Sequence, residues 1–318
     1  MNSSNVLVSV VLPCYNAEKY IKEAVTSILN QTHQNLELII IDDCSQDQSL
    51  SILESFKDQR ITIIKNEENL GYPQSMNKGI SIAKGKYIAR MDADDVSAHD
   101  RIALQVTLHE NHPECALVSS RRCLLSPNGT AYAKADTIKH DPPFFKETWM
   151  QLYDGSRAFT DAASLVLKKN IDEVGGYQTY QRSGMDVDLW FRIMEKTNSN
   201  ALVINKFLYL RRLIPEAITF SMKTKANLVL DKAYERNRLT KAIEKKTYDE
   251  NQRTESFVRF LSSIAVHCFV VKDYKGFYAF LMKAISFRKY LYKNVFLNLL
   301  RKYYHFKTKN ELVVLDVD

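Results

Sequence analysis

Three aspartates, Asp92, Asp94 and Asp95, stand close together directly after a short apolar run, Tyr87–Met91. A run of this kind is typical of a buried strand, so the carboxylates gather where that strand ends. Such a cluster repels itself unless a cation or a hydroxyl-rich ligand is present. Mg²⁺ and Mn²⁺ favour carboxylate oxygens and often bridge to phosphates. The alternative is an Asp-rich turn that caps the next helix, and these residues alone leave both interpretations open.

A second acidic pair, Asp42 and Asp43, ends another apolar run, Leu36–Ile41. Ligands of parallel sheets bind at the carboxyl ends of the strands, so both clusters are expected at one site. There, Asp43 could accept a hydrogen bond from a nucleotide base, and Asp92 could bind ribose hydroxyls. Asp94 could ligate a divalent cation that bridges a diphosphate and neutralises the departing phosphate. The chain has no G-x-G-x-x-G or G-x-x-x-x-G-K-[ST] motif, which argues against dinucleotide-binding and P-loop proteins.

A transferase that uses such a leaving group needs a base for the incoming hydroxyl. The segment Gly184–Trp190 supplies Asp186 and Asp188 where an amphipathic helix is expected to begin. Residues two apart point in different directions on a helix, so only one of them need face the site. The alternative is that both acids stabilise the amino terminus of the helix through its dipole.

The elements that must place these side chains alternate along the first third of the chain. Apolar, β-branched runs predict strands, and apolar residues three and four apart predict helices. This alternation implies right-handed crossovers and an α/β fold, with a mostly parallel sheet flanked by helices. The predicted strands are Val6–Pro13, Leu36–Ile41, Ile61–Ile64 and Tyr87–Met91, and the predicted helices are Glu18–Asn30, Ser49–Phe56 and Pro73–Ala83.

The later part of the chain divides near residue 214, between a domain of residues 1–214 and a helical, basic region of residues 215–318. From Glu216 on, strand signals vanish and helical periods continue to about Tyr304. Before that boundary we expect a helix from Arg101 to Asn111, strands at Cys115–Ser119 and Arg122–Leu125, a short helix at Phe144–Tyr153, a strand at Ala162–Leu167, a helix at Asp186–Met194 and a last strand at Ala201–Leu210.

The composition is that of a globular protein, with 45% apolar and 25% charged residues in a chain of 318. This length suits one large domain, or one domain with an appendage. There is no apolar run of about 18 residues, so no membrane-spanning helix is expected. The amino terminus has no basic segment followed by an apolar one, so a secretory signal is not expected. The five scattered cysteines indicate reduced thiols in a cytoplasmic protein.

The net charge of +7 is concentrated near the carboxyl terminus, because residues 271–310 carry ten Lys or Arg and one acid. The rest of the chain sums to −2, which argues against a nucleic-acid-binding core. Within the basic stretch, Lys289–Tyr304 mixes cations with Tyr, Phe and Leu. Three interpretations stay open: peripheral contact of residues 271–310 with an anionic membrane, packing with a solvated basic face, and self-association, as in a homodimer.

Five segments, taken in order, resemble the motifs of family 2 glycosyltransferases over about residues 6–210. They are Val8–Asn16, Leu38–Asp47, Asn69–Gly71 with Asn77–Gly79, Ala89–Asp95 and Met185–Trp190. The resemblance implies a GT-A fold and an inverting, metal-dependent transfer from a nucleotide-diphosphate sugar. It also implies a glycan or lipid-linked glycan as the acceptor and UDP as the usual carrier, with dTDP and GDP as open alternatives. The expected setting is a bacterial surface polysaccharide such as O-antigen or capsule, made at the inner face of the cytoplasmic membrane.

Carried over position by position, the resemblance implies that Asp43 contacts the base and that Asp92 lies near the ribose. Asp94 would be the ligand of Mn²⁺ or Mg²⁺. Arg90 would support the site, and Asp186 would be the general base of a single displacement. The same segments imply that the donor site includes Pro13, Tyr15, Asn16, Asn77 and Ala93.

The chain departs from the family pattern at three places. Met185 stands where the family usually has Glu, Cys44 where many members have Gly, and Ala162–Ala163 where many have a His. A Gln-x-x-Arg-Trp segment is absent, which argues against a processive synthase. Two other functions stay open: a catalytically silent relative that binds nucleotide sugars or glycans, and a sugar nucleotidyltransferase. The latter would need a Gly-rich, basic phosphate loop where Pro13–Ala17 stands.

Overall fold

The structure of the chain is a computed structural model. It describes residues 5–126, 128–134, 142–148, 161–179, 185–214 and 312–314, together with the single residues Tyr274, Tyr278 and Met282. Contacts within the chain divide it into two units. The first comprises residues 1–122 and 140–211, and the second comprises residues 123–139 and 212–318. All of the predicted site residues belong to the first unit.

The first unit is built on parallel strands in the spatial order β4-β1-β2-β3. They are β1 (Val8–Cys14), β2 (Leu36–Asp42), β3 (Ile61–Lys65) and β4 (Tyr87–Arg90), close to the predicted bounds. β1 is buried at every position but one, as expected of a central strand covered on both faces. The register places Cys14 beside Asp42 and Val11 beside Arg90. The acidic residues that follow β2 and β4 therefore leave the sheet at the same edge.

Antiparallel strands extend this sheet beyond β4. β9 (Leu165–Leu167) pairs with β4, and β6 (Leu117–Leu125) pairs with β9. β10 (Ala201–Arg212) pairs with β5 (Val96–Ser97) and with β8 (Phe144–Glu147). The sheet is therefore mixed, and its parallel part carries the acidic clusters, as the α/β prediction requires.

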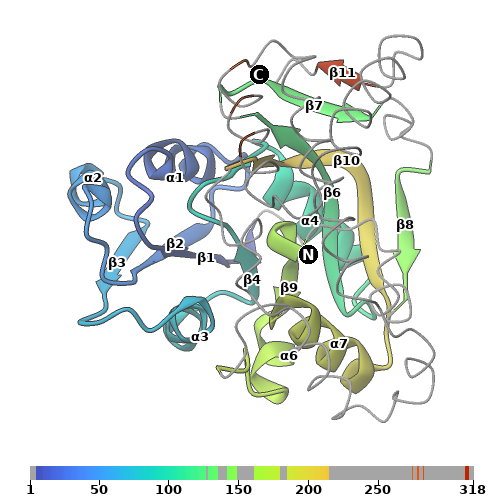
Figure 1. Cartoon of the computed structure of the whole chain (residues 1–318). Coiled ribbons are helices and arrows are strands. Elements are labelled where there is room, and N and C mark those ends of the chain that lie inside the picture. The colour runs from blue at the N-terminus through green and yellow to red at the C-terminus, as the bar shows by residue number, and fades with distance from the viewer. Residues whose placement is uncertain are drawn as a thin grey trace, which may run out of the picture. The chain divides into compact units, whose positions relative to one another are not determined.

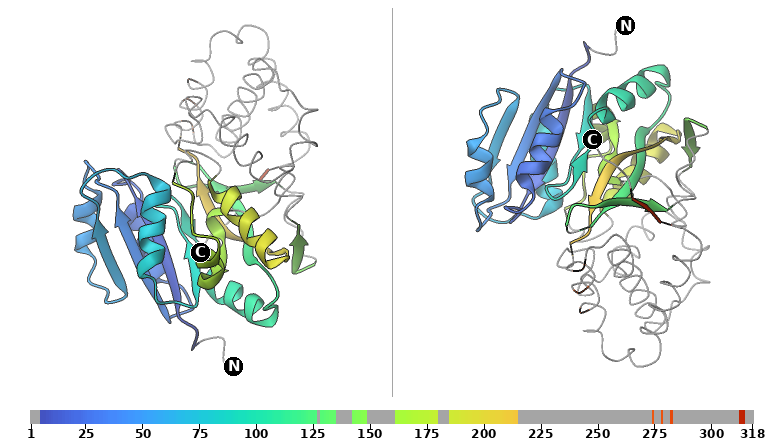
Figure 2. Two further views of the ribbon diagram at one scale, coloured as in Figure 1. Left: turned by 90° about the horizontal axis from the view of Figure 1, so that it is seen from below. Right: turned by 90° about the horizontal axis from the view of Figure 1, so that it is seen from above.

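Helices cover both faces of the sheet (Figure 1). α1 (Ile21–Leu29), α2 (Ser49–Ser55) and α4 (Arg101–Asn111) contribute to one apolar core. The other core lies on the opposite face and contains residues of α3 (Tyr72–Ile82), α6 (Lys168–Glu173) and α7 (Met185–Thr197). Figure 2 shows this division, because α3 lies in front of the parallel strands seen from below and α1 lies in front of them seen from above.

α3 approaches β1 closely because it has no side chain at Gly79. A Cβ atom built at this position would lie 2.5 Å from Cγ1 of Val11, closer than real Cβ atoms come to a neighbour. Glycine within a helix costs roughly 1 kcal/mol relative to alanine. This cost in helix stability is the consequence of packing α3 so close to β1.

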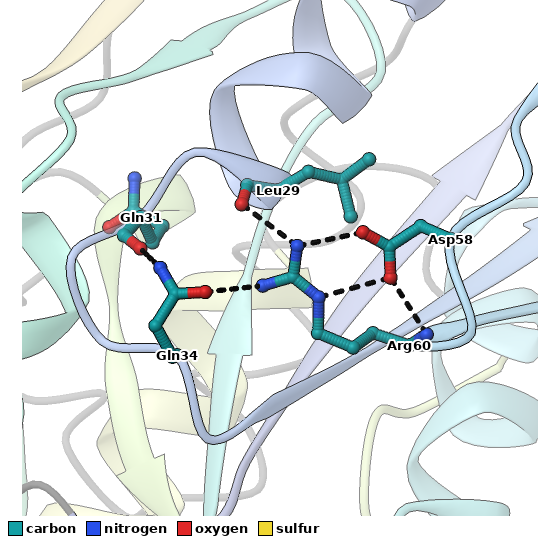
Figure 3. Close-up of polar contacts among 5 residues, drawn as sticks. All are labelled: Leu29, Gln31, Gln34, Asp58 and Arg60. Carbon is teal, nitrogen blue, oxygen red and sulfur yellow. Dashed lines mark hydrogen bonds and ion pairs between the residues drawn. The ribbon is translucent and has the colours of Figure 1, made fainter.

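Arg60 fastens the end of α1 to the start of β3 (Figure 3). Its Nη2 donates to the carbonyl of Leu29 at 3.0 Å, and its Nε and Nη2 donate to the carboxylate of Asp58 at 3.0 and 2.8 Å. Its Nη1 donates to Oε1 of Gln34 at 3.3 Å, and Gln34 donates in turn to the carbonyl of Gln31. These hydrogen bonds from Arg60 lower the pKa of Asp58 to about 2.

Three predictions about individual elements were wrong. The two strands expected at Cys115–Ser119 and Arg122–Leu125 form one continuous strand, β6, which begins at Leu117. Phe144–Glu147 is strand β8 and not the start of a helix, because it pairs along β10; residues 149–153 of that predicted helix lie outside the described residues. The expected strand Ala162–Leu167 begins as a 3₁₀ turn at Asp161–Ala163 and becomes extended only at Leu165.

In the second unit, the end of β6 pairs with β7 (Ala131–Lys134), and β7 pairs with β11 (Leu312–Val314). The expectation that Ala201–Leu210 is the last strand was therefore also wrong; β11 is short, but it is rich in β-branched residues. The helices predicted between 217 and 304 lie outside the described residues, apart from three single helical positions. The boundary near residue 214 stays a prediction. In the part of the chain that the structure describes, no helix has the length and apolar character needed to cross a bilayer.

Candidate functional site

Asp43 lies directly after β2 and is buried. Its Oδ1 accepts hydrogen bonds from Nδ2 of Asn66 at 2.7 Å and from the backbone N–H of Leu70 at 2.9 Å. Its Oδ2 accepts one from the backbone N–H of Gly71 at 2.8 Å. Gly71 has a φ of 85°, in the left-handed region that favours glycine, and it precedes α3. Asp43 thus fixes the loop that enters α3, and Oδ2 retains capacity for one more donor, because each carboxylate oxygen can accept two hydrogen bonds.

Asn66, which donates to Asp43, is itself held by side chains of α3. Its Nδ2 also donates to Oγ of Ser75 at 3.0 Å, and its Oδ1 accepts a hydrogen bond from Nζ of Lys78 at 2.6 Å. The amide therefore connects Asp43 to two side chains of α3 and brings a positive charge close to that carboxylate. Neither Asn66 nor Lys78 was among the predicted site residues. The available signals were the position of Asn66 just after a predicted strand and that of Lys78 within Asn77–Gly79.

The turns that follow β1 and β2 bind each other. The backbone N–H of Asn16 donates to Oγ of Ser45 at 3.1 Å, and Oδ1 of Asn16 accepts from the N–H of Gln46 at 2.8 Å. Asn16 and Cys44 both adopt left-handed backbone conformations, with φ values of 51° and 63°. This conformation gives a physical reason why many members of the family in the resemblance have glycine where Cys44 stands.

The predicted donor residues of the first turn are unevenly exposed. Tyr15 is 51% exposed, and Pro13 is half-buried beside Ile41 of β2. Tyr15 is thus available to a ligand at the edge where the acidic clusters lie, while Pro13 forms part of the sheet.

Arg90, the last residue of β4, gathers the predicted carboxylates around a buried cation. Its side chain is 3% exposed, and its Nη1 lies 3.0 Å from Oδ1 of Asp186. Its Nη2 lies 3.2 Å from Oδ1 of Asp92 and donates to the hydroxyl of Tyr72. Burial alone disfavours the charge on Arg90, but Asp186, Tyr177, Tyr72 and Asp92 more than offset this, so the pKa of Arg90 lies above its ordinary value. One arginine thus holds the predicted ribose-binding residue and the predicted base together.

The remaining residues of the acidic segment follow Asp92 in a tight loop. The backbone N–H of Asp95 donates to the carbonyl of Asp92 at 3.4 Å. Asp95 is buried, whereas Ala93 and Asp94 are half-buried. Of the three carboxylates, Asp92 and Asp94 are therefore the ones that a ligand can reach, and Asp95 shapes the loop.

Two residues outside the predicted set support this loop. The backbone N–H of Asp92 donates to the hydroxyl of Tyr209 at 3.2 Å. The guanidinium of Arg101 lies 5.5 Å from the centre of the Tyr209 ring, and its Nη1 donates to the carbonyl of Arg90 at 3.1 Å. Arg101 is fully buried, and this burial lowers its pKa to about 10. The separation of more than a hundred residues between Tyr209 and Asp92 left no signal in the sequence.

Asp186 and Asp188 face different partners, as their spacing predicts. Asp186 lies in the first turn of α7 and pairs with Arg90. Asp188 is buried and pairs with Arg192 one turn later at 2.8 Å. Arg192 also donates to the carbonyls of Val174 and Gly176, so Asp188 supports the packing of α7. Only Asp186 joins the cluster of predicted site residues.

Asn77 was predicted in the donor site, and the structure shows both ends of its amide bound to Tyr177. Nδ2 donates to the carbonyl of Tyr177 at 2.8 Å, and Oδ1 accepts from the N–H of Tyr177 at 2.8 Å. The Tyr177 ring meets Tyr72 edge to face at 6.1 Å and Trp190 at 6.5 Å. Asn77 thus ties α3 to the turn before α7, and its contact with a donor stays a prediction.

These contacts join four of the predicted site residues, Asp43, Arg90, Asp92 and Asp186, into one network. Asp43 binds the N–H of Gly71, Tyr72 follows Gly71, and Tyr72 contacts Arg90. Arg90 then holds Asp92 and Asp186. Asp43, which accepts hydrogen bonds at one end of the network, is therefore connected to the carboxylate of Asp186 at the other end. The connection runs through Tyr72 and Arg90 at the carboxyl edge of the sheet.

A divalent cation fits the chemistry of the acidic segment but has few protein ligands there. In the described residues, no three His, Cys, Asp or Glu side chains come together as a metal site. Asp94 offers a half-buried carboxylate, and hard cations such as Mg²⁺ are commonly held by one or two carboxylates, substrate phosphates and water. The residues therefore fit a cation that a diphosphate and water help to coordinate.

Comparison with known proteins identifies a family match. The profile of "Glycosyl transferase family 2" matches residues 9–175. The chain is 32% identical over 223 residues to a putative teichuronic acid biosynthesis glycosyltransferase, TuaG, of Bacillus subtilis; the match covers 69% of this chain and 84% of that one. It is 40% identical over 104 residues to the Escherichia coli UDP-Glc:alpha-D-GlcNAc-diphosphoundecaprenol beta-1,3-glucosyltransferase WfaP, covering 33% of this chain and 41% of that one.

Two further matches are a second bacterial relative and a solved structure. An uncharacterized glycosyltransferase of Haemophilus influenzae is 47% identical over 116 residues, and the match covers 36% of each chain. A crystal structure of Staphylococcus aureus TarS 1–349 in complex with UDP superimposes with a TM-score of 0.54 at 17% identity, covering 90% of this chain and 93% of that one. At this identity, the likeness to TarS establishes the fold alone.

Proposed function

The chain belongs to glycosyl transferase family 2, and we propose that it transfers a sugar from a nucleotide-diphosphate sugar, with UDP as the carrier, to a glycan or lipid-linked glycan acceptor. The reaction is an inverting single displacement. Asp186 takes the proton of the acceptor hydroxyl, the oxygen attacks the anomeric carbon, and the nucleoside diphosphate leaves from the opposite face. The products are the glycosylated acceptor and the nucleoside diphosphate.

The observation that carries this proposal is the contact of Arg90 with both Asp92 and Asp186. A general base must lie near the hydroxyl that it deprotonates, and that hydroxyl must lie near the sugar of the donor. Arg90 holds the base beside the carboxylate that meets the ribose, so donor and acceptor would meet at this point. An ion pair also favours the charged form of a carboxylate, and the charged form is the one that accepts a proton.

The donor is oriented by the other end of the network. Asp43 receives the N–H of the base through Oδ2, and the exposed ring of Tyr15 and the turn at Asn16 lie at the same edge of the sheet. The name of the E. coli relative, which specifies UDP-Glc, supports UDP as the carrier. A bound Mg²⁺ or Mn²⁺ on Asp94 would offset the negative charge that builds on the leaving diphosphate.

The acceptor belongs to bacterial surface polysaccharide synthesis, such as that of O-antigen or capsule. The names of the Bacillus and Escherichia relatives, which specify teichuronic acid and a diphosphoundecaprenol-linked sugar, support this class. A lipid-linked acceptor fits a chain whose residues 271–310 carry a charge of +9 and can bind the anionic inner face of the cytoplasmic membrane. Tyr274, Tyr278 and Met282, which are exposed, add apolar surface to that stretch. Sedimentation with phosphatidylglycerol vesicles, and its absence with phosphatidylcholine vesicles, tests this contact.

The test of the function is a screen of nucleotide sugars for donor hydrolysis and transfer, with Mn²⁺ and with a chelator. Asp186→Asn should lower turnover on the order of 100-fold or more, because it removes the base, and should leave UDP binding by calorimetry nearly unchanged. Asp172→Asn is the matched control, because Asp172 is an exposed helical aspartate paired with Lys168. The control should keep wild-type turnover.

Other outcomes of the screen distinguish the competing functions. Nucleotide-sugar binding without turnover in wild type would indicate a catalytically silent relative. Release of pyrophosphate from a sugar phosphate and a nucleoside triphosphate would indicate a nucleotidyltransferase. Full turnover in Asp186→Asn would refute the assignment of the base, and turnover that a chelator does not affect would remove the metal from the reaction.

A further inference from the structure

Tyr72 stands where the two ends of the site network meet. It is the first residue of α3, it is half-buried, and its hydroxyl accepts a hydrogen bond from Nη2 of Arg90. The Arg90 guanidinium also lies 5.2 Å from the centre of the Tyr72 ring. The hydroxyl and the ring therefore both contact the cation that holds Asp92 and Asp186.

Few groups determine the direction of the Arg90 side chain. Two of its contacts are carboxylates, Asp92 and Asp186, and the third is the hydroxyl of Tyr72. Its Nε is buried without a hydrogen-bond partner in the described part of the chain. Asp92 and Asp186 keep 30% and 23% of their side-chain surface exposed, so neither is rigidly enclosed. The hydroxyl of Tyr72 is an uncharged hydrogen-bond partner of the guanidinium, and it constrains where that group points.

The position of Tyr72 is itself set by Asp43. The backbone N–H groups of Leu70 and Gly71 both donate to the Asp43 carboxylate, so the residues directly before Tyr72 are held to the end of β2. On the other side, the Tyr72 ring packs edge to face on Tyr177, whose backbone is bound by Asn77 of the same helix. A ligand that binds Asp43 therefore acts on the carboxylate that holds Leu70 and Gly71, the two residues before Tyr72.

We propose that Tyr72 is a positioning residue that orients Arg90, and through it Asp186, and so couples the nucleotide-base end of the site to the proton-accepting end. This inference rests on the proposed function, because it assigns a consequence to the direction of Asp186. Tyr72 itself touches neither the reacting atoms nor the donor. Its hydroxyl acts by keeping the guanidinium between the two carboxylates.

Tyr72→Phe tests the proposal, because it keeps the ring and removes the hydroxyl. We expect kcat to fall on the order of 10-fold, since catalysis is sensitive to small displacements of a catalytic group. The Kd of UDP should stay within about 2-fold, because Asp43 still holds Leu70 and Gly71. The titratable groups around Asp186 are Arg90, Tyr72, Asp92 and Tyr177 from the neighbouring elements and Asp188 on its own helix. With Arg90 less firmly held, Asp186 loses part of its cationic partner, and the acidic limb of the pH–rate profile should move to higher pH.

Tyr87→Phe is the matched control. The Tyr87 hydroxyl lies at the opposite end of β4, is also engaged by a charged side chain, and donates to Oε1 of Glu110 at 2.6 Å. Tyr87→Phe should change the melting temperature about as much as Tyr72→Phe does, but it should leave kcat and the pH–rate profile unchanged.

If Tyr72→Phe keeps both the wild-type kcat and the wild-type acidic limb while Asp186→Asn is inactive, the positioning role is wrong and the proposed function stands. If Asp186→Asn is fully active, the proposed function fails first. A fall in kcat accompanied by an equal loss of UDP affinity would also overturn the inference, because it would place Tyr72 in donor binding.

Discussion

Arg60 and Arg90 bind carboxylates at opposite edges of the parallel sheet, and they do so in different ways. Arg60 precedes β3 and faces one carboxylate, Asp58, while its remaining contacts are a carbonyl and an amide oxygen. Arg90 ends β4 and faces two carboxylates and a phenol. The side chain of Arg60 is 25% exposed and that of Arg90 is 3% exposed. The first cluster is electrically balanced and partly solvated, whereas in the second a buried guanidinium lies between two carboxylates.

The difference in burial and in the number of carboxylates leads us to expect a stabilising role for the Arg60 cluster and a ligand-binding role for the Arg90 cluster. A balanced surface pair contributes about 0–1 kcal/mol and needs no further partner. Two carboxylates that share one buried guanidinium can also interact with a bound cation or a hydroxyl-rich donor. We therefore expect the Arg90 cluster, and not the Arg60 cluster, to respond to a bound substrate. Four substitutions can break or sharpen this contrast.

The largest effect is expected from Arg90→Gln. Loss of the cation leaves Asp92 and Asp186 facing each other without compensation, and the free energy of unfolding should fall by about 2–3 kcal/mol. Turnover should fall on the order of 100-fold, because the two carboxylates lose their common partner. Chemical denaturation and initial rates measure both effects. If Arg90→Gln is as stable and active as wild type, the Arg90 cluster has no functional role that the Arg60 cluster lacks.

Asp92→Asn should separate stability from binding. It leaves Arg90 with one carboxylate, as Arg60 has, so the free energy of unfolding should change by less than about 1 kcal/mol. The Kd of the donor should rise on the order of 10-fold, because the ribose hydroxyls lose a charged acceptor. Calorimetric titration with UDP gives the affinity. If stability falls sharply while affinity is unchanged, Asp92 supports the fold and does not bind the donor.

Arg60→Gln should be a smaller and purely structural change. It removes the pair with Asp58 and the hydrogen bond to the end of α1, and the free energy of unfolding should fall by about 1 kcal/mol. Kinetic parameters should stay at wild-type values, because the change lies at the edge of the sheet away from the acidic segment. An altered kcat would mean that the amino edge of the sheet also influences the site.

The smallest effect concerns pH. The pKa of Asp58 is lowered to about 2 in the folded chain, against an ordinary value of 3.8. A carboxylate with a depressed folded pKa adds stability above its unfolded pKa, and this stability is lost as pH falls toward the folded pKa. Asp58→Asn should therefore lower the free energy of unfolding by a few tenths of a kcal/mol at neutral pH. The difference should shrink below about pH 4 and be lost as pH falls through about 2. Denaturation of both proteins over this range measures it.

Sequence patterns predicted the parallel part of the fold because its elements are long and strongly periodic. β1 to β4 and the helices between them fall close to their predicted bounds, and Asp92 and Asp186 lie together as expected. Patterns failed where pairing over a distance decides the structure. Phe144–Glu147 could begin a helix by its sequence, and it becomes strand β8 only because β10 lies beside it.

The contacts that complete the site were out of reach for a related reason. Tyr72 meets Arg90, Asn77 binds the backbone of Tyr177 one hundred residues later, and Tyr209 holds Asp92 across a still larger separation. Nothing in the local sequence of these tyrosines distinguishes them from core residues. Motifs report which residue types the chemistry requires, whereas the side chains that hold those residues in place depend on the packed structure.

The bare backbone at Gly79 has a consequence for how this site can vary. α3 carries Tyr72 at its start and Asn77 two residues before the glycine, and it packs closely on β1 where the side chain is absent. Even a methyl group there would lift the helix and tilt both side chains at once. A position inside the helix packing therefore constrains where Tyr72 and Asn77 lie, and we expect few residues other than glycine to be tolerated there.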